Sequence, residues 1–323
     1  MPHTSSEAVI TVLGPIAPNK LGVTDAHDHL FLRTPALPGQ EFDDAGLAIE
    51  EVGNAKRGGL QAIVELTPIG CGRRPAGMRA VAETTGVNVV AATGYHRDAH
   101  YPQNHWVREA TVEVLAQRIV TDLKEGMHPE DWLTDAPLDH ARAGVIKAGA
   151  SYQHISPFEE RRLVAAAIGC RETGAAIVVH TEIGTCAHAI IDLLTSEGVE
   201  PGRIILAHLD RNPDLELHCE VAARGVTLEY DTPGRIKYRP DSQLIDLIES
   251  MAAAGFGGSV LLGLDLGQRD YFSAYGGGPG LTYLMDVFGP RLRRRIGDAA
   301  VDLILVANAA RAFALAGGNA PGK

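Results

Sequence analysis

The chain has 323 residues, of which 45% are hydrophobic and 21% are charged. A chain of this length and composition buries a large core, so we expect one domain over residues 1–323 rather than several small ones. The formal net charge of −11 argues against a nucleic-acid partner, because a surface that binds phosphate backbones needs clustered lysine and arginine.

The sequence also predicts a cytoplasmic protein without a membrane partner. Its opening residues, MPHTSSEAVI, lack the basic and apolar stretches of a secretory signal, and no apolar run reaches the roughly 18–20 residues that span a bilayer. The cysteines form no C-x-x-C pair and are read as reduced thiols; they are Cys71, Cys170, Cys186 and Cys219.

Residues 1–20 contain a short predicted strand pair, AVITVLGPI, which we expect to cap the fold. Eight apolar, β-branched runs then recur, each followed by turn residues and a helix-like stretch, as in a parallel sheet. They are VTDAHDHLFL from Val23, AIVELTP from Ala62, VNVVAATGY from Val87, AGVIKAG from Ala143, AAIVVHTE from Ala175, RIILAHLD from Arg203, VTLEYDT from Val226 and SVLLGLD from Ser259. The predicted fold class is therefore α/β, a (β/α)₈ TIM barrel with a short N-terminal strand pair.

Two of the intervening segments carry clear helix signals. Apolar residues recur at helical spacing over 105–126, which ends at a glycine. Ser156 and Pro157 have the residue types of an N-cap and a first helical position, and that segment ends at Gly174. Segment 127–142, rich in aspartate and proline, is predicted to be an irregular connection.

Polar side chains gather at the C-terminal ends of the predicted strands, where barrel enzymes build their active sites. These residues are His27, His29, Glu65, Tyr95, Lys147, His180, His208, Asp231 and Asp265. Isolated polar or charged groups are costly to bury unless they are paired or bound to a metal. Their coincidence at strand ends therefore predicts a metal site.

The H-x-H pair strengthens this prediction. Alternate residues on a strand share a face, so His27 and His29 can converge on one ion while Asp28 points the other way. The remaining histidines are interpreted as surface or supporting groups; they are His3, His96, His100, His105, His128, His140, His154, His188 and His218.

Lys147 is the unusual member of the set, because a cationic ammonium beside metal ions would be repelled. A buried lysine with a lowered pKa can react at its amine, which leaves two chemistries open. The amine could form a carbamate with CO₂ and bridge two metals, or it could form a Schiff base with a carbonyl substrate, as in a barrel aldolase. A plain salt bridge to Glu65 or Asp265 is the third interpretation. The four histidines at strand ends favour the carbamate.

Taken together, several motifs resemble the phosphotriesterase family of the amidohydrolase superfamily. They are VLGPI, LGVTDAHDHL, VAATGYH, AGVIKAG, VVHTEIGT, IILAHLDRN and LLGLD, and the resemblance runs from about residue 10 to about residue 315. Two departures stand out: HDH replaces the common HEH, and Glu65 could compete as a ligand.

The resemblance implies a binuclear centre of two divalent ions, with zinc the first expectation and manganese, cobalt or iron alternatives. It implies that His27, His29 and Asp265 hold the buried ion, and that His180 and His208 hold the more exposed one. N6-carboxylated Lys147 would bridge the ions together with a hydroxide. Asp265 and Lys147 are thus the predicted catalytic residues, and the resemblance also suggests a homodimer.

The loops after the seventh and eighth strands indicate the substrate, since such loops often hold a phosphate in barrel enzymes. The candidate substrate-binding residues are Arg235, Lys237, Arg269, Tyr271 and Tyr275, with Tyr95 at the end of the third strand. Arginine and lysine there would complement an anionic group, although they could also be solvated loop charges.

The RIKY and GGGPGLTYL stretches also resemble the phospho-furanose lactonases of that family. We therefore expect a catabolic hydrolase that opens a small-molecule lactone, in particular a phosphorylated sugar lactone, by attack of a metal-bridging hydroxide. A phosphotriesterase (aryldialkylphosphatase), or a neutral or acyl-homoserine lactonase, would share the same metal ligands. A Schiff-base aldolase and a non-enzymatic scaffold are the alternatives from other classes.

Overall fold

The computed structural model describes residues 7–129 and 136–316. Its main sheet has eight parallel strands in chain order, each hydrogen-bonded to the next. The strands are β3 (Thr24–Asp28), β4 (Ala62–Glu65), β5 (Asn88–Gly94), β6 (Val145–Ala150), β7 (Ile177–Thr181), β8 (Ile204–Ala207), β9 (Thr227–Tyr230) and β10 (Val260–Leu262). Each of the eight strands predicted from the sequence is confirmed.

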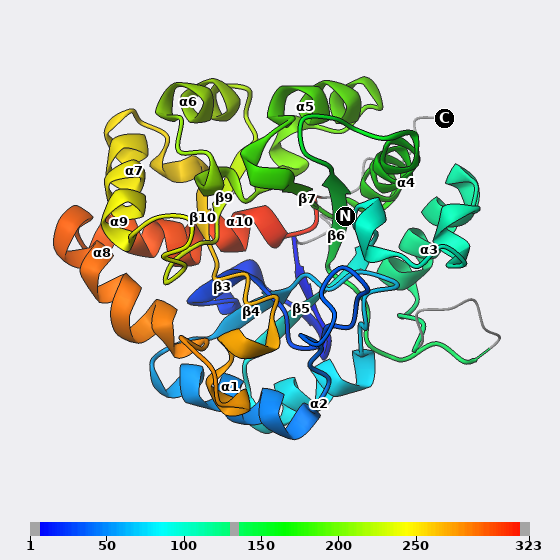
Figure 1. Cartoon of the computed structure of the whole chain (residues 1–323), viewed down its shortest axis with the longest axis horizontal. Coiled ribbons are helices and arrows are strands. Elements are labelled where there is room, and N and C mark those ends of the chain that lie inside the picture. Colours follow the sequence, from blue (N-terminus) through cyan, green and yellow to red (C-terminus); the bar gives the residue numbers. More distant parts are fainter. Residues whose placement is uncertain (1–6, 130–135, 317–323) are drawn as a thin grey trace, which may run out of the picture.

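The sheet closes on itself between the last strand and the first. The backbone N–H groups of Leu264 and Asp265, just after β10, both donate to the carbonyl oxygen of His27 in β3. Helices surround the strands (Figure 1). They are α1 (Ala45–Arg57), α2 (Pro75–Thr85), α3 (Val112–Lys124), α4 (Pro157–Thr173), α5 (Ala187–Ser196), α6 (Leu215–Ala223), α7 (Asp241–Ala253), α8 (Gly289–Ile296), α9 (Asp298–Asp302) and α10 (Ala309–Phe313). The fold is a TIM barrel, as predicted.

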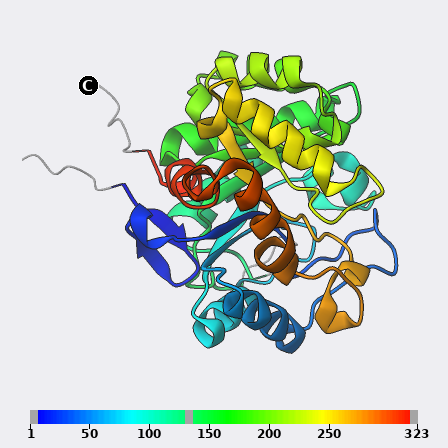
Figure 2. The same cartoon turned by 90° about the vertical axis from the view of Figure 1, so that its left-hand side faces the viewer.

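The predicted N-terminal strand pair is present as β1 (Val9–Thr11) and β2 (Gly14–Ile16), which pair antiparallel. Val12, just after β1, donates its N–H to the carbonyl of Val89 at the start of β5. The pair therefore covers the N-terminal end of the barrel, and the strand ends that carry the polar residues open on the other side. Figure 2 shows the pair in blue at one edge of the molecule.

The helix predictions hold for α4 and need a correction for α3. Ser156 and Glu159 form a reciprocal capping box at the start of α4, and Gly174 ends the helix at a φ of 77°. The segment predicted as one helix over 105–126 instead contains a short 3₁₀ turn followed by α3. Thr111 interrupts it, because its backbone is extended and its side-chain hydroxyl accepts the N–H of Val114 as an N-cap.

Contacts between loops fix the C-terminal mouth of the barrel. Glu51, a buried residue of α1, accepts hydrogen bonds from the backbone N–H groups of Ala274 (2.7 Å) and Leu281 (2.8 Å) in the segment after β10. The side chain of Gln40, in the loop after β3, donates to Asp270 at 3.0 Å and accepts from its backbone N–H at 3.2 Å. These two loops are therefore joined to each other and to α1. No helix among the described residues is long and apolar enough to cross a membrane.

Candidate active site

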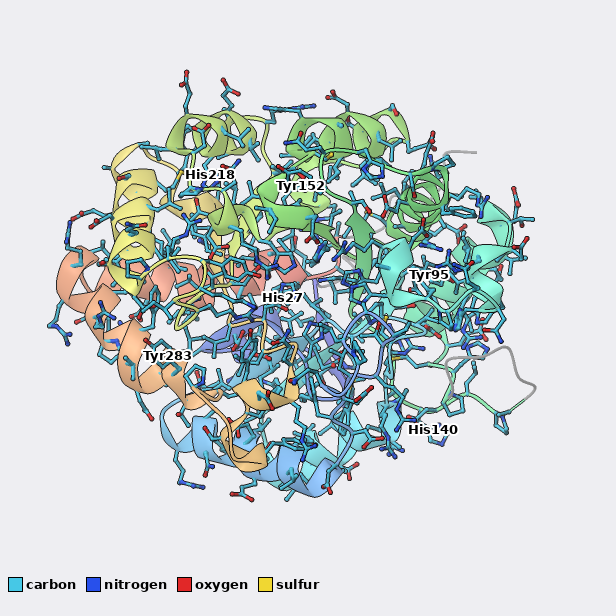
Figure 3. The ribbon with its side chains drawn as sticks, viewed as in Figure 1. His27, Tyr95, His140, Tyr152, His218 and Tyr283 are labelled. Carbon is cyan, nitrogen blue, oxygen red and sulfur yellow. The ribbon has the colours of Figure 1, made fainter. Side chains whose placement is uncertain are left out.

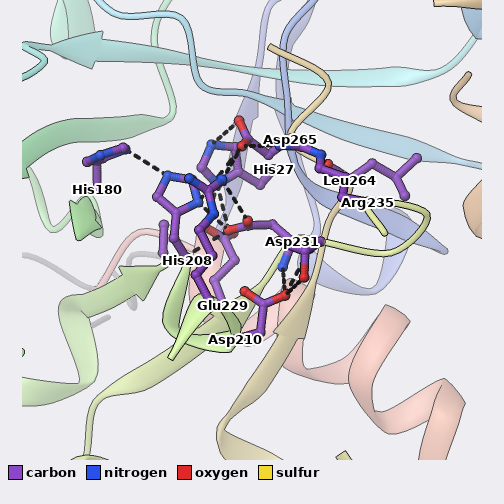
Figure 4. A network of polar contacts seen from close by, with 12 residues as sticks. His27, His180, His208, Asp210, Glu229, Asp231, Arg235, Leu264 and Asp265 are labelled. Carbon is purple, nitrogen blue, oxygen red and sulfur yellow. Dashed lines mark hydrogen bonds and ion pairs between the residues drawn. The ribbon is translucent and has the colours of Figure 1, made fainter. Parts of the chain in front are cut away.

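The six predicted metal ligands line one cavity at the centre of the barrel. Figure 3 labels His27 there, and Figure 4 shows His27 with His180, His208 and Asp265. The Nζ atom of Lys147 lies 3.2 Å from Nε2 of His27. One carboxylate oxygen of Asp265, Oδ1, lies 3.6 Å from Nε2 of His27 and 3.3 Å from Nε2 of His29. The ligand atoms of His27, His29 and Asp265 all lie within 4.8 Å of one another.

The other two histidines face each other beside this group. His208 Nε2 lies 2.8 Å from His180 Nδ1, and the ring centroids of His27 and His208 are 5.0 Å apart. His27, His208 and Asp231 form a second group whose ligand atoms lie within 4.8 Å. The structure thus brings the predicted ligands into two adjoining sets, while their roles as ligands stay a prediction.

Each of the four histidines also has an oxygen atom within 2.8 Å of the ring nitrogen that points away from this centre. His27 Nδ1 bonds Glu229 at 2.8 Å, and His29 Nδ1 bonds the Thr67 hydroxyl at 2.8 Å. The Thr67 hydroxyl donates to the carbonyl of Phe31, so it accepts from His29. This arrangement of outer acceptors is typical of metal-binding histidines, because it directs the free lone pair of each ring inward.

The pair formed by His180 and His208 gives a more specific indication of a cation. His180 Nε2 bonds Glu182 at 2.7 Å, and His208 Nδ1 lies 2.7 Å from Asp231. If each outer nitrogen carries the proton, the two inner nitrogens are both acceptors at 2.8 Å and repel each other. A cation that accepts both lone pairs removes this conflict, so the residues fit a divalent metal ion.

The imidazoles have the protonation state that metal binding needs. Burial lowers the pKa of His27 and His208 well below the usual histidine value and that of His180 to about 4. These rings are therefore neutral near pH 7 and can offer lone pairs.

The carboxylate of Asp265 has two distinct sides. Its Oδ1 atom faces the histidines, whereas Oδ2 accepts hydrogen bonds from Arg211 and, at 3.0 Å, from Arg235. Burial alone would raise the pKa of Asp265, but Arg235 and the neighbouring histidines hold it well below its usual value.

The backbone is strained at two of the predicted ligands: Asp265 has a φ of 47° and His208 a φ of 67°. Such strained backbone is concentrated at functional sites.

Lys147 is buried, and burial lowers the pKa of its amine. In the described part of the chain it makes no salt bridge to Glu65 or Asp265, so the plain salt-bridge interpretation is wrong. Glu65 accepts instead from the backbone N–H groups of Leu30 and Thr67, and burial raises its pKa to about 7. With its oxygens on backbone donors, Glu65 is not a competing ligand in this arrangement.

A cavity of about 210 Å³ is lined by the six predicted metal ligands. Its lining also includes His96, Arg97, His100, Glu182, Arg211, Arg235, Lys237, Tyr238, Gln268 and Tyr271, with Leu32, Ala36, Leu37 and Pro68 as an apolar wall. Three of the predicted substrate-binding residues, Arg235, Lys237 and Tyr271, therefore face the cavity. Lys237 donates to the Tyr271 hydroxyl at 2.7 Å.

The other three predicted substrate-binding residues do not line this cavity. Tyr95 is buried, and its hydroxyl donates to the carbonyl of Leu115 in the outer helix α3. The guanidinium of Arg269 lies over the ring of Tyr275, 5.5 Å from its centroid. The Tyr275 hydroxyl accepts the N–H of Asp44. These contacts hold all three side chains outside the lining of the cavity.

Several cavity residues were missed by reasoning from sequence. His96 and His100, interpreted as surface or supporting groups, are buried in the cavity wall with ring centroids 3.6 Å apart. Glu182 and Arg211 lie within the quoted motifs VVHTEIGT and IILAHLDRN but were given no role, and Arg97 directly follows VAATGYH. The alternation from His180 to Glu182 is the one signal that could have identified Glu182.

Comparison with known proteins identifies the family of the chain. The profile of the phosphotriesterase family matches residues 7–313. A phospho-furanose lactonase of Mycoplasmopsis synoviae is 33% identical over 94% of this chain and 91% of its own length.

Solved structures of similar proteins have the same fold. A lactonase from Listeria monocytogenes superposes with a TM-score of 0.88 at 28% identity, covering 96% of this chain and 99% of that one. The phosphotriesterase homology protein of Escherichia coli, solved with phosphate in its active site, gives a TM-score of 0.82 at 29% identity, covering 91% of this chain and 99% of that one. The chain therefore belongs to the phosphotriesterase family of metal-dependent hydrolases.

Proposed function

We propose that this hydrolase opens the ring of a phosphorylated five-carbon sugar lactone. The observation that carries the proposal is a small cavity with the histidine and aspartate cluster at its base and Arg235, Lys237 and Tyr271 in its wall. Its 210 Å³ is below the roughly 300–1,000 Å³ typical of pockets for drug-sized ligands. A compact anionic substrate suits this space better than a long acyl chain does.

The relatives support the same substrate class. A phospho-furanose lactonase is among the proteins most similar in sequence, and the similar protein from Escherichia coli holds phosphate in its active site. Lys237 and Tyr271 would contact a phosphate at the outer side of the cavity, with the lactone carbonyl toward the histidines.

Two divalent ions in the centre, with zinc as the first expectation, would supply a hydroxide at neutral pH and polarise the carbonyl under attack. His27, His29 and Asp265 would hold one ion, and His180 and His208 the other. Because burial favours the neutral amine of Lys147, this lysine is suited to form the carbamate that bridges them.

Asp265 would take the proton of the attacking hydroxide and carry it to the leaving group. Its Oδ1 atom faces the reaction centre, while Arg211 and Arg235 hold Oδ2. Since Arg235 and the neighbouring histidines hold the pKa of Asp265 well below its usual value, the carboxylate would keep a proton only briefly. It would pass the proton to the ring oxygen, which leaves as a hydroxyl group while the carbonyl becomes a carboxylate.

The test is a substrate panel on the purified protein, beside its metal content. The panel contains a five-carbon lactone with and without phosphate, an acyl-homoserine lactone and a paraoxon-type ester. We expect the largest kcat/KM on the phosphorylated lactone and loss of activity with a chelator. Faster turnover of the acyl-homoserine lactone or the phosphotriester would overturn the assignment. Borohydride trapping on Lys147 with indifference to chelators would instead support the aldolase.

A further inference from the structure

We propose that Glu182 is a positioning residue that sets the tautomer and orientation of His180, and that Arg97 holds Glu182 in place for this role. The inference rests on the metal-dependent function proposed above. Glu182 lies two positions after the predicted ligand His180 and is not itself one of the six predicted ligands.

The contacts form a short chain from the metal centre into the cavity. One carboxylate oxygen of Glu182, Oε2, lies 2.7 Å from Nε2 of His180 and 2.9 Å from Nη2 of Arg97. Because Glu182 Oε2 lies between the Arg97 guanidinium and the His180 ring, it accepts from His180 Nε2 and leaves the Nδ1 lone pair directed at His208.

The backbone after β7 holds Glu182 in this orientation. The chain turns sharply there, with Ile183 at a φ of 53° and Gly184 at 68°. The hydroxyl of Thr185 donates to the carbonyl of Glu182 at 2.7 Å and accepts the N–H of Gln153 at 3.0 Å. The turn is thus joined to the loop after β6. It directs the Glu182 carboxylate back toward the His180 ring.

Glu182 differs from the acceptors of the other histidines. Thr67, Glu229 and Asp231 are fully buried, with 0% of their surface exposed. The Glu182 side chain is 22% exposed and the Arg97 side chain 25%, and both line the cavity. His180, one of the two histidines predicted to hold the more exposed ion, is therefore oriented by an ion pair in the cavity wall, whereas the other three histidines have fully buried neighbours.

A surface glutamate provides a matched comparison. Glu220 lies 3.3 Å from Nε2 of His188, and both side chains are about half exposed, at 57% and 43%. This pair repeats the contact between glutamate and histidine away from the metal centre. Any effect that comes merely from breaking such a pair should appear in Glu220→Ala as well.

The experiment is a titration of the metal-free protein with Co²⁺, followed by visible absorption, which needs no substrate. Glu182→Ala should raise the Kd of the more exposed ion by about tenfold to a hundredfold, as losses of outer acceptors do. Glu182→Gln should recover part of this loss, because the amide oxygen still accepts from Nε2–H. Arg97→Met should have a smaller effect in the same direction, and Glu220→Ala should match the wild type.

A further variant, His208→Asn, removes another ligand of the same ion and so identifies its binding step. The inference is overturned if the wild type binds two ions while Glu182→Ala keeps both Kd values within twofold of wild type. It is also overturned if Glu182→Ala weakens both ions equally, since that indicates general loosening of the barrel. If the wild type binds no Co²⁺, the metal-dependent function itself fails and this inference fails with it.

Discussion

Replacing Lys237 by methionine removes one positive charge from the cavity wall and keeps most of the length of the side chain. Lys237 is exposed, and its ammonium contacts the Tyr271 hydroxyl and the faces of Tyr238 and Tyr271. It pairs with no carboxylate in residues 7–129 and 136–316. Its charge is therefore available to a phosphate, unlike that of Arg235, which is engaged by Asp265.

The expected loss can be worked from these contacts. A hydrogen bond to a charged group contributes about 1.5–3 kcal/mol, and the exposure of Lys237 places the contribution near the lower limit. About 1.5 kcal/mol corresponds to roughly a tenfold fall in kcat/KM. The fall should appear with the phosphorylated lactone and be absent with its unphosphorylated counterpart.

Arg269→Met is the matched control, because Arg269 is a cation in the loop after β10, at the same end of the barrel, but lies over Tyr275 outside the cavity lining. Initial rates with both lactones give kcat/KM for each variant. Equal losses on the two lactones for Lys237→Met, or an equal loss for Arg269→Met, would refute the proposed phosphate position.

Three further predictions concern the metal centre and the barrel. Lys147→Ala should reduce the metal content from about two ions per chain to less than one by elemental analysis; an unchanged content would exclude a bridging role. Gly94→Ala should destabilise the metal-free protein by about 3 kcal/mol in urea unfolding, because a Cβ would lie 2.2 Å from the Lys147 carbonyl at a φ of 88°; a change below 1 kcal/mol would show that the strands can separate locally. Asp122→Asn should cost about 3 kcal/mol, since Arg73 would remain buried without its carboxylate 2.7 Å away. Burial raises the Asp122 pKa, but Arg73 and hydrogen bonds bring it below its ordinary 3.8, so this difference should persist above that pH and shrink as the pH falls through the lower native value; a difference that grows in acid would contradict the argument.

The barrel and its cluster of histidine and aspartate side chains were predictable because both depend on regular strands. The run around Val89 and those like it are short, apolar and separated by turn residues, and eight of them close a barrel. Once the strands are assigned, their C-terminal ends must meet on one side. His27, His180 and Asp265 therefore come together although more than 200 positions separate the first and the last.

The direction of loop side chains was not predictable in the same way. Lys237 and Arg269 have the same charge and lie in neighbouring loops, yet only Lys237 lines the cavity. A loop has no periodicity that assigns a face to each residue. Its orientation comes from contacts with distant segments, such as those of Gln40 with Asp270 and of Glu51 with Ala274.

The sequence alone therefore determined the architecture and the cluster at its centre, because hydrophobic periodicity and strand ends are local properties of the chain. Only the tertiary structure decided which charges face the substrate and which groups orient the histidines. Glu229, Thr67 and Asp231 reach His27, His29 and His208 from other strands or loops. Such pairings depend on distances between strands that have no counterpart in the spacing of residues along the chain.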